Sequence, residues 1–117
     1  MSQIKRLYDI LEADEHSILL RMNEDHPVYQ GHFPGDPITP GVLSLRMIRE
    51  CLSQDAGCPL HYAAIKTCRY MALIRPGDTL RLQRQITNNE DSITVKATLY
   101  NAENPDDIRL QLDAELR

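Results

Sequence analysis

The sequence predicts an α+β fold in which one curved antiparallel sheet wraps around one long central helix. A single apolar run over residues 41–54 is typical of a buried helix, and the half of the chain that follows alternates apolar and polar residues. Strands with one wet face and a mostly apolar helix bury each other most simply when the sheet curves around the helix. Repeats and linkers are not seen, so residues 1–117 are expected to form one domain.

Before the helix, one segment of undecided type, one strand and one irregular segment are expected. Residues 4–11 fit either a strand or a short helix, and residues 17–22 predict a strand. Residues 26–43 hold four prolines and three glycines. Proline fixes φ and glycine admits conformations that other residues avoid, so most of this segment should be a stiff loop. Such a loop would hold His32, near its centre, in one position.

The loop is expected to lead directly into the helix, with Thr39 as N-cap and Pro40 as first helical residue. The free N–H groups near Gly41 and Val42, together with the positive end of the helix dipole, favour a partial negative charge. A histidine beside such a helix start indicates proton abstraction next to a carbonyl whose oxygen becomes negative.

The second half is expected to be β-structure. A late glycine and proline at 57 and 59 close the helix. Alternating apolar residues then predict strands, separated by polar turns at 75–78, 88–91 and 101–107. The predicted strands are residues 61–71, 80–86, 93–99 and 108–116.

Composition excludes several classes of function. A formal net charge of −4, the lack of a basic run and an aromatic content of 5% argue against nucleic-acid binding. The sequence shows no apolar run long enough to cross a membrane and no signal-peptide pattern. Three cysteines without a CxxC pair favour reduced thiols and a cytoplasmic location. The four histidines are scattered, so no metal site is expected.

Two motifs resemble the hotdog-fold 3-hydroxyacyl-[acyl carrier protein] dehydratases, the FabZ and FabA group. The first is GHFPGDP at 31–37 followed by PGVL at 40–43, and the second ends in RPGDTL at 75–80. The resemblance implies a hotdog fold and loss of water from a 3-hydroxyacyl thioester in fatty-acid or polyene-type biosynthesis. The product would be a trans-2-enoyl thioester, formed without a metal or redox cofactor. The acyl chain would arrive on the phosphopantetheine arm of an acyl carrier protein.

The resemblance also assigns roles to residues of the loop and helix. His32 would remove the α-proton, and the Gly41 N–H would bind the thioester carbonyl. Phe33 and Val42 are expected at the substrate pocket, with Phe33 mainly packing. A histidine that only braces the loop and a glycine needed only for close packing remain alternatives. The resemblance further implies a dimer joined edge to edge, with itself or with another hotdog subunit, whose sites use residues of both subunits.

One position departs from the family pattern. Where the family has an acidic residue on the helix, this chain has Arg46, which does not titrate in the working range. Arg46 can instead bind an anionic substrate group. The missing acid could be Glu50 one turn later, His32 acting through a water, or a glutamate from another subunit. The departure also leaves open a catalytically degenerate acyl-thioester-binding subunit and, less favoured, a hotdog thioesterase.

Overall fold

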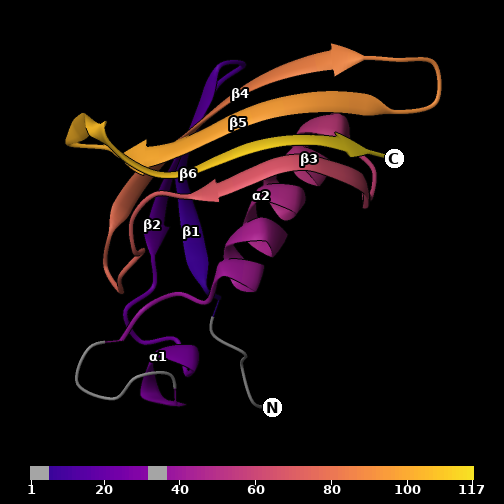
Figure 1. Ribbon diagram of the computed structural model, residues 1–117. Coiled ribbons are helices and arrows are strands. Elements are labelled where there is room, and N and C mark those ends of the chain that lie inside the picture. The colour runs from indigo at the N-terminus through magenta and orange to yellow at the C-terminus, as the bar shows by residue number, and fades with distance from the viewer. Residues whose placement is uncertain (1–5, 32–36) are drawn as a thin grey trace.

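The order of elements follows the pattern expected from the sequence. The structure, a computed structural model, describes residues 6–31 and 37–117. Strands β1 (Tyr8–Ala13) and β2 (Ser17–Met22) precede the one-turn helix α1 (Val28–Gly31) and the long helix α2 (Gly41–Ala56). They are followed by β3 (Tyr62–Tyr70), β4 (Thr79–Asn88), β5 (Ile93–Asn101) and β6 (Asn104–Leu116). The described strands form one antiparallel sheet in the order β1-β2-β4-β5-β6-β3, which arches over α2 (Figure 1).

The core lies between the inner face of this sheet and one side of α2. Every second residue of β5 and β6 is buried over 95–99 and 110–116, as the alternation predicted. The helix contributes Met47, Ile48, Cys51 and Leu52, each at most 1% exposed. Burying a side chain of this size stabilises the fold by roughly 1.5–3 kcal/mol. The predicted curved sheet around a central helix is therefore confirmed.

The start of α2 differs by one residue from the prediction. Pro40 is the N-cap and Gly41 the first helical residue, so the expectation that Thr39 caps the helix is wrong. Thr39 is buried, and its hydroxyl lies 2.7 Å from the Tyr29 hydroxyl. Its N–H donates to the Ile74 carbonyl at 2.7 Å. The hydroxyl and the N–H of Thr39 therefore hold the incoming loop rather than the first turn of the helix.

Three other boundaries were placed imperfectly or left open by the sequence. Helix α2 continues to Ala56 and ends at Gly57, whose φ of 72° lies in the left-handed region that favours glycine. The ambiguous segment 4–11 contains the start of strand β1. The polar turn expected at 101–107 shrinks to two residues, because β6 begins at Asn104 and pairs with β5 from there.

Within the loop, one turn of helix forms at α1. The Val28 N–H donates to His26 Nδ1 at 3.0 Å, and the Gln30 N–H donates to the Pro27 carbonyl at 3.0 Å. His26 is half-buried, and its ring caps this turn. Residues 37–40 are irregular, as expected for a segment rich in proline.

Strand β3 forms one edge of the sheet. It pairs with β6 along one side, and most of its residues are exposed. Ile65 and Tyr70 expose 43% and 55% of their surface, and Met71 just beyond exposes 56%. An edge of this kind is a template for pairing with another chain. The dimer implied by the resemblance stays a prediction, but the chain has an edge suited to it.

Arg84 joins the end of α2 to the sheet. Its side chain is 5% exposed although it lies on an otherwise apolar strand face. Its Nε and Nη2 donate to the two carboxylate oxygens of Asp55, with Nη2 2.9 Å from Oδ1, and Nη2 also donates to the Asp14 carbonyl. Its Nη1 is buried without a hydrogen-bond partner among the described residues. The guanidinium therefore depends on Asp55 for its neutralising charge.

Replacing Asp55 by alanine is expected to lower the free energy of unfolding by about 2 kcal/mol, because Arg84 would stay buried without its counter-charge. The loss is smaller than for a fully enclosed pair because the Asp55 side chain is 24% exposed. Urea unfolding measures it, with exposed Asp106→Ala as the matched control. Adding Arg84→Met to the Asp55→Ala variant should recover part of the lost stability. Equal losses in Asp55→Ala and Asp106→Ala would contradict a stabilising role for the Arg84–Asp55 ion pair.

Candidate functional site

The first turn of α2 opens on a cavity of about 600 Å³, here called the helix-start cavity. It is lined by residues 38–41, Ser44 and residues 70–74. The Leu43 and Ser44 amides donate to the Pro40 carbonyl at 3.0 and 3.2 Å, so they are already used. The Gly41 amide precedes them and has no hydrogen bond to a described residue. This end of the helix can therefore offer a backbone donor to a ligand.

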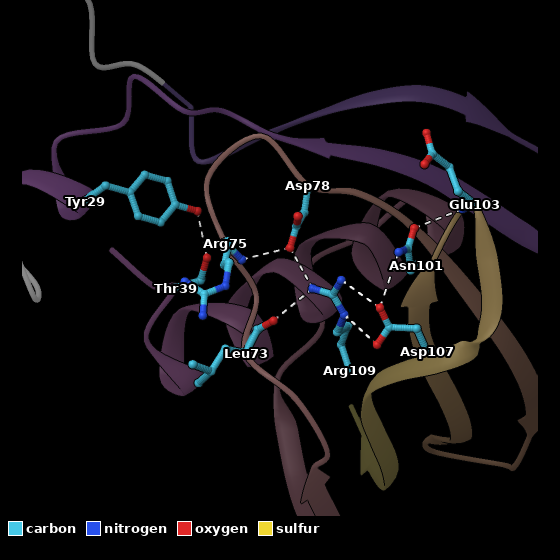
Figure 2. A network of polar contacts seen from close by, with 9 residues as sticks. All are labelled: Tyr29, Thr39, Leu73, Arg75, Asp78, Asn101, Glu103, Asp107 and Arg109. Atoms are coloured by element: carbon cyan, nitrogen blue, oxygen red, sulfur yellow. Dashed lines mark hydrogen bonds and ion pairs between the residues drawn. The ribbon is translucent and has the colours of Figure 1, made fainter. Parts of the chain in front are cut away.

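The outer wall of this cavity, residues 71–74, is held by Arg109 of β6 (Figure 2). Arg109 Nη1 donates to the Leu73 carbonyl at 2.8 Å and to Asp78 Oδ2 at 2.6 Å. Its Nε and Nη2 donate to the two carboxylate oxygens of Asp107, at 3.1 and 3.0 Å. These hydrogen bonds from Arg109 hold the pKa of Asp107 below its usual value. Because the Met71 and Ala72 N–H groups also donate to the Arg109 carbonyl, the wall is attached to β6 at several points.

Tyr70, the last residue of β3, lies directly against Gly41. A Cβ atom at position 41 would stand 2.8 Å from Tyr70 Cζ and 3.0 Å from its hydroxyl oxygen, so a side chain there would have to displace the ring. Partial burial, aided by the neighbouring Cys68 thiol, raises the pKa of Tyr70 to about 12. The phenol is therefore neutral near pH 7 and can donate a hydrogen bond beside the helix start.

A second cavity of about 610 Å³ lies between β1 and the side of α2, and is here called the helix-side cavity. Its lining residues come from the start of β1, the turn before α1 and one side of α2. They are residues 6–10, His26, Leu43, Arg46, Glu50 and Gln54.

Glu50 is fixed within the helix-side cavity by two neighbours. The Tyr8 hydroxyl donates to its Oε1 at 3.1 Å, and Arg46 Nε lies 3.5 Å from its Oε2. Burial raises the pKa of Tyr8, so the phenol remains a donor to the carboxylate. The Arg46 side chain is 65% exposed, so its pairing with Glu50 contributes little to stability. Arg46 and Glu50 thus form an ion pair across one turn of the helix.

His26 is a feature of the helix-side cavity that sequence reasoning did not assign to a site. Because its Nδ1 accepts the Val28 N–H, the neutral ring carries its proton on Nε2. It shares the cavity with Arg46 and Glu50, which are distant from it in the sequence. The signal available in the sequence was only its position before a proline, which does not distinguish a cap from a site residue.

The structure divides the predicted helix residues between the two cavities. Gly41 lines the helix-start cavity, whereas Arg46 and Glu50 line the helix-side cavity. Gly41 and Glu50 are nine residues apart on the helix, which corresponds to about 13 Å along its axis. Within one chain these residues therefore line two separate cavities.

The remaining predicted site residues lie elsewhere. Val42 is 71% exposed and is not among the residues that line the two cavities. His32 and Phe33 lie outside the described residues.

Within residues 6–31 and 37–117, histidine, cysteine and acidic side chains do not gather in a group of three suited to a metal ion. Over the same residues, neither helix is long and apolar enough to cross a lipid bilayer.

A family model described as ApeI dehydratase, of the ApeI-like group, matches residues 9–107. The 3-hydroxyacyl-[acyl-carrier-protein] dehydratase FabZ of Chloroflexus aggregans is 40% identical over 72 residues, covering 56% of this chain and 50% of the relative. The same enzyme of Caldicellulosiruptor saccharolyticus is 30% identical over 105 residues, covering 83% and 75%. The match thus spans half the length of the first relative and three quarters of the second.

Solved structures show the same fold. An uncharacterized protein of Erwinia carotovora subsp. atroseptica has a TM-score of 0.68 at 23% identity, covering 93% of this chain and 90% of that one. The dehydratase heterocomplex ApeI:P of Xenorhabdus doucetiae has a TM-score of 0.68 at 18% identity, covering 96% and 97%. The PaaI protein of Escherichia coli has a TM-score of 0.68 at 15% identity, covering 94% and 82%. At such identities these likenesses establish the hotdog fold alone.

Proposed function

This chain belongs to the ApeI-like dehydratase family, and we propose that it removes water from a 3-hydroxyacyl thioester in fatty-acid or polyene-type biosynthesis. The observation that supports this most is the helix start, where Gly41 meets a cavity directly after the histidine-bearing motif. The substrate would be carried by the phosphopantetheine arm of an acyl carrier protein, the carrier that the FabZ relatives' names give for those enzymes.

In this proposal His32 takes the α-proton and the electron pair moves onto the thioester carbonyl. The Gly41 N–H donates to the oxygen that becomes negative, an interaction whose loss typically costs about 3 kcal/mol. The electron pair then returns to form the C2–C3 double bond. The 3-hydroxyl group leaves with a proton from an acid, so the products are water and the trans-2-enoyl thioester.

The source of that proton is the open step, because Arg46 cannot supply it. Glu50 of the same chain is disfavoured, since it lies in the other cavity and is held there by Tyr8 and Arg46. We therefore place the acid on a second hotdog subunit, and His32 acting through a water is the alternative. The exposed edge at β3 offers a place for such a subunit, and one structural neighbour is itself a heterocomplex.

The second candidate function is an acyl-thioester-binding subunit that no longer catalyses, within a hotdog heterodimer. The single feature that favours it is Arg46, because a guanidinium has replaced the proton donor while the cavity at Gly41 persists. A hotdog thioesterase is less supported, since it would need a carboxylate positioned to activate water at the helix start. The described side chains that line the helix-start cavity include no carboxylate.

One assay separates these candidates. The purified chain is incubated with a 3-hydroxyacyl carrier thioester, alone and with a hotdog subunit that carries the helix glutamate, while enoyl product and free thiol are followed. Enoyl formation supports the dehydratase, and formation only in the mixture supports an acid from the partner. Binding without turnover in both samples supports the non-catalytic subunit, and free thiol supports the thioesterase.

An Arg46→Glu variant tests the acid directly, with Arg46→Gln as the matched control that removes the charge without adding a carboxylate. If only the acid is missing, the glutamate variant alone should form enoyl product at least tenfold faster than the glutamine variant. Equal rates would show that position 46 does not reach the reacting hydroxyl in this chain.

A further inference from the structure

Ser44 is a buried polar residue that the proposed reaction does not use. It is 1% exposed, lines the helix-start cavity and lies on α2 three residues after Gly41. Its hydroxyl has no hydrogen bond to a described residue. Its Oγ is not among the fully buried side-chain atoms that lack a partner in the described residues, so the hydroxyl group is open to the cavity. Alanine is a better helix former than serine. The Ser44 hydroxyl therefore makes no hydrogen bond within the described residues that would hold the fold, and it is available to a ligand in the cavity.

Tyr70 brings a second hydroxyl group to the same cavity. Its ring contacts Gly41, and its oxygen lies 3.0 Å from where a Cβ of residue 41 would stand. The Thr39 hydroxyl, by contrast, is already engaged by Tyr29. Much of the remaining lining is apolar, as at Leu73 and Ile74. An apolar cavity with a few convergent polar groups is the usual form of a small-molecule site.

We propose that the Ser44 and Tyr70 hydroxyl groups bind the carbonyl oxygen of an acyl thioester, beside the Gly41 N–H. This inference rests on the proposed function and adds two side-chain donors to its carbonyl subsite. Residues three apart on a helix are neighbours, so Ser44 borders Gly41 on the helix, while Tyr70 borders it from the sheet. Neutral donors hold a carbonyl oxygen and bind it more tightly once it gains negative charge.

The test uses butyryl-pantetheine labelled with ¹³C at the thioester carbonyl, a probe that has no 3-hydroxyl group and cannot lose water. Infrared difference spectra report hydrogen bonds to this carbonyl as a shift of its stretching band to lower wavenumber. Ser44→Ala and Tyr70→Phe should each lose part of the shift and weaken binding about threefold, and the double variant about tenfold. Tyr100 is a half-buried tyrosine on β5, and Tyr100→Phe is the matched control. It should change neither the shift of the carbonyl band nor the affinity for the probe.

Thermal unfolding separates this role from a structural one. Ser44→Ala should melt at the same temperature as the wild type or higher, because it removes no hydrogen bond to a described residue and alanine favours the helix. A lower melting temperature with an unchanged carbonyl band would overturn the proposal. So would a wild-type band that does not shift on binding, or a shift that survives in the double variant.

The proposed dehydration can fail independently of this subsite. In one outcome, the carbonyl band shifts in the wild type but not in the double variant, and neither protein forms enoyl product. The carbonyl subsite then stands, and the dehydratase assignment falls. If the wild type forms enoyl product and the double variant keeps both its carbonyl band and its rate, the dehydratase stands and these hydroxyl groups have no part in it.

Discussion

His32→Ala is expected to lower kcat for enoyl formation by about 10²–10⁴-fold, the usual contribution of a positioned general base. KM should change little, because the proposed carbonyl contacts at Gly41 do not involve the imidazole. The reason is chemical: an imidazole with a pKa near neutrality can take the α-proton, whereas alanine leaves only water to do so. Initial rates across a range of substrate concentrations measure both constants.

Two other histidines serve as controls. His16→Ala, on an exposed turn, should leave the rate unchanged. His26→Ala tests the helix-side cavity, because this ring lies there with Arg46 and Glu50. A large loss in His26→Ala together with a normal rate in His32→Ala would contradict the proposed base and move the reaction to the helix-side cavity.

The fold could be predicted because its determinants are local. The period of two in residues 93–99 and 108–116, and the apolar run that becomes α2, are visible in short stretches of sequence. Gly57 likewise ended the helix where a glycine in the left-handed region is favoured. Such features need no knowledge of which distant residues meet.

The features that sequence reasoning missed all depend on distant partners. Arg84 is an unexpected buried charge on a strand face because Asp55, at the end of α2, neutralises it. Thr39 does not cap the helix because Ile74 and Tyr29 take its polar groups. Neither pairing follows from residue type or spacing, since the sheet brings these residues together only after folding.

The candidate site was predictable to the same limited extent. The sequence indicated a helix start at Pro40, one residue before the observed start at Gly41. It also indicated that Arg46 and Glu50 share one helix face, which the structure has. It did not indicate that these two features line separate cavities, because that separation is set by where β1 and residues 71–74 pack against α2. Tyr70 likewise meets Gly41 only because strand β3 ends beside the first turn of the helix.

Arg109→Met is expected to lower the free energy of unfolding by about 3 kcal/mol, or roughly 10–20 °C in melting temperature. The Arg109 side chain is 11% exposed, and its guanidinium bonds Asp78, Asp107 and the Leu73 carbonyl. Methionine fills the space of the stem but removes the guanidinium donors from the Leu73 carbonyl and from the Asp78 and Asp107 carboxylates. The two carboxylates then keep only the Arg75 N–H and the Asn101 amide as donors. Urea unfolding measures the loss. The exposed Arg117→Met is the matched control, and its loss should stay below about 1 kcal/mol.

The same substitution should change how stability depends on pH. Hydrogen bonds from Arg109 lower the pKa of Asp107 in the folded state. The stabilisation that these hydrogen bonds give is fully present above the pKa of Asp107 in the unfolded chain, about 3.9. It is lost as the pH falls through the lower pKa of Asp107 in the folded protein. The stability difference between wild type and Arg109→Met should therefore be largest near pH 6 and shrink on acidification. A difference that stays constant down to pH 2 would show that the guanidinium acts by packing alone.

Because Arg109 also holds the wall of the helix-start cavity at Leu73, the variant should bind the labelled thioester more weakly even where it remains folded.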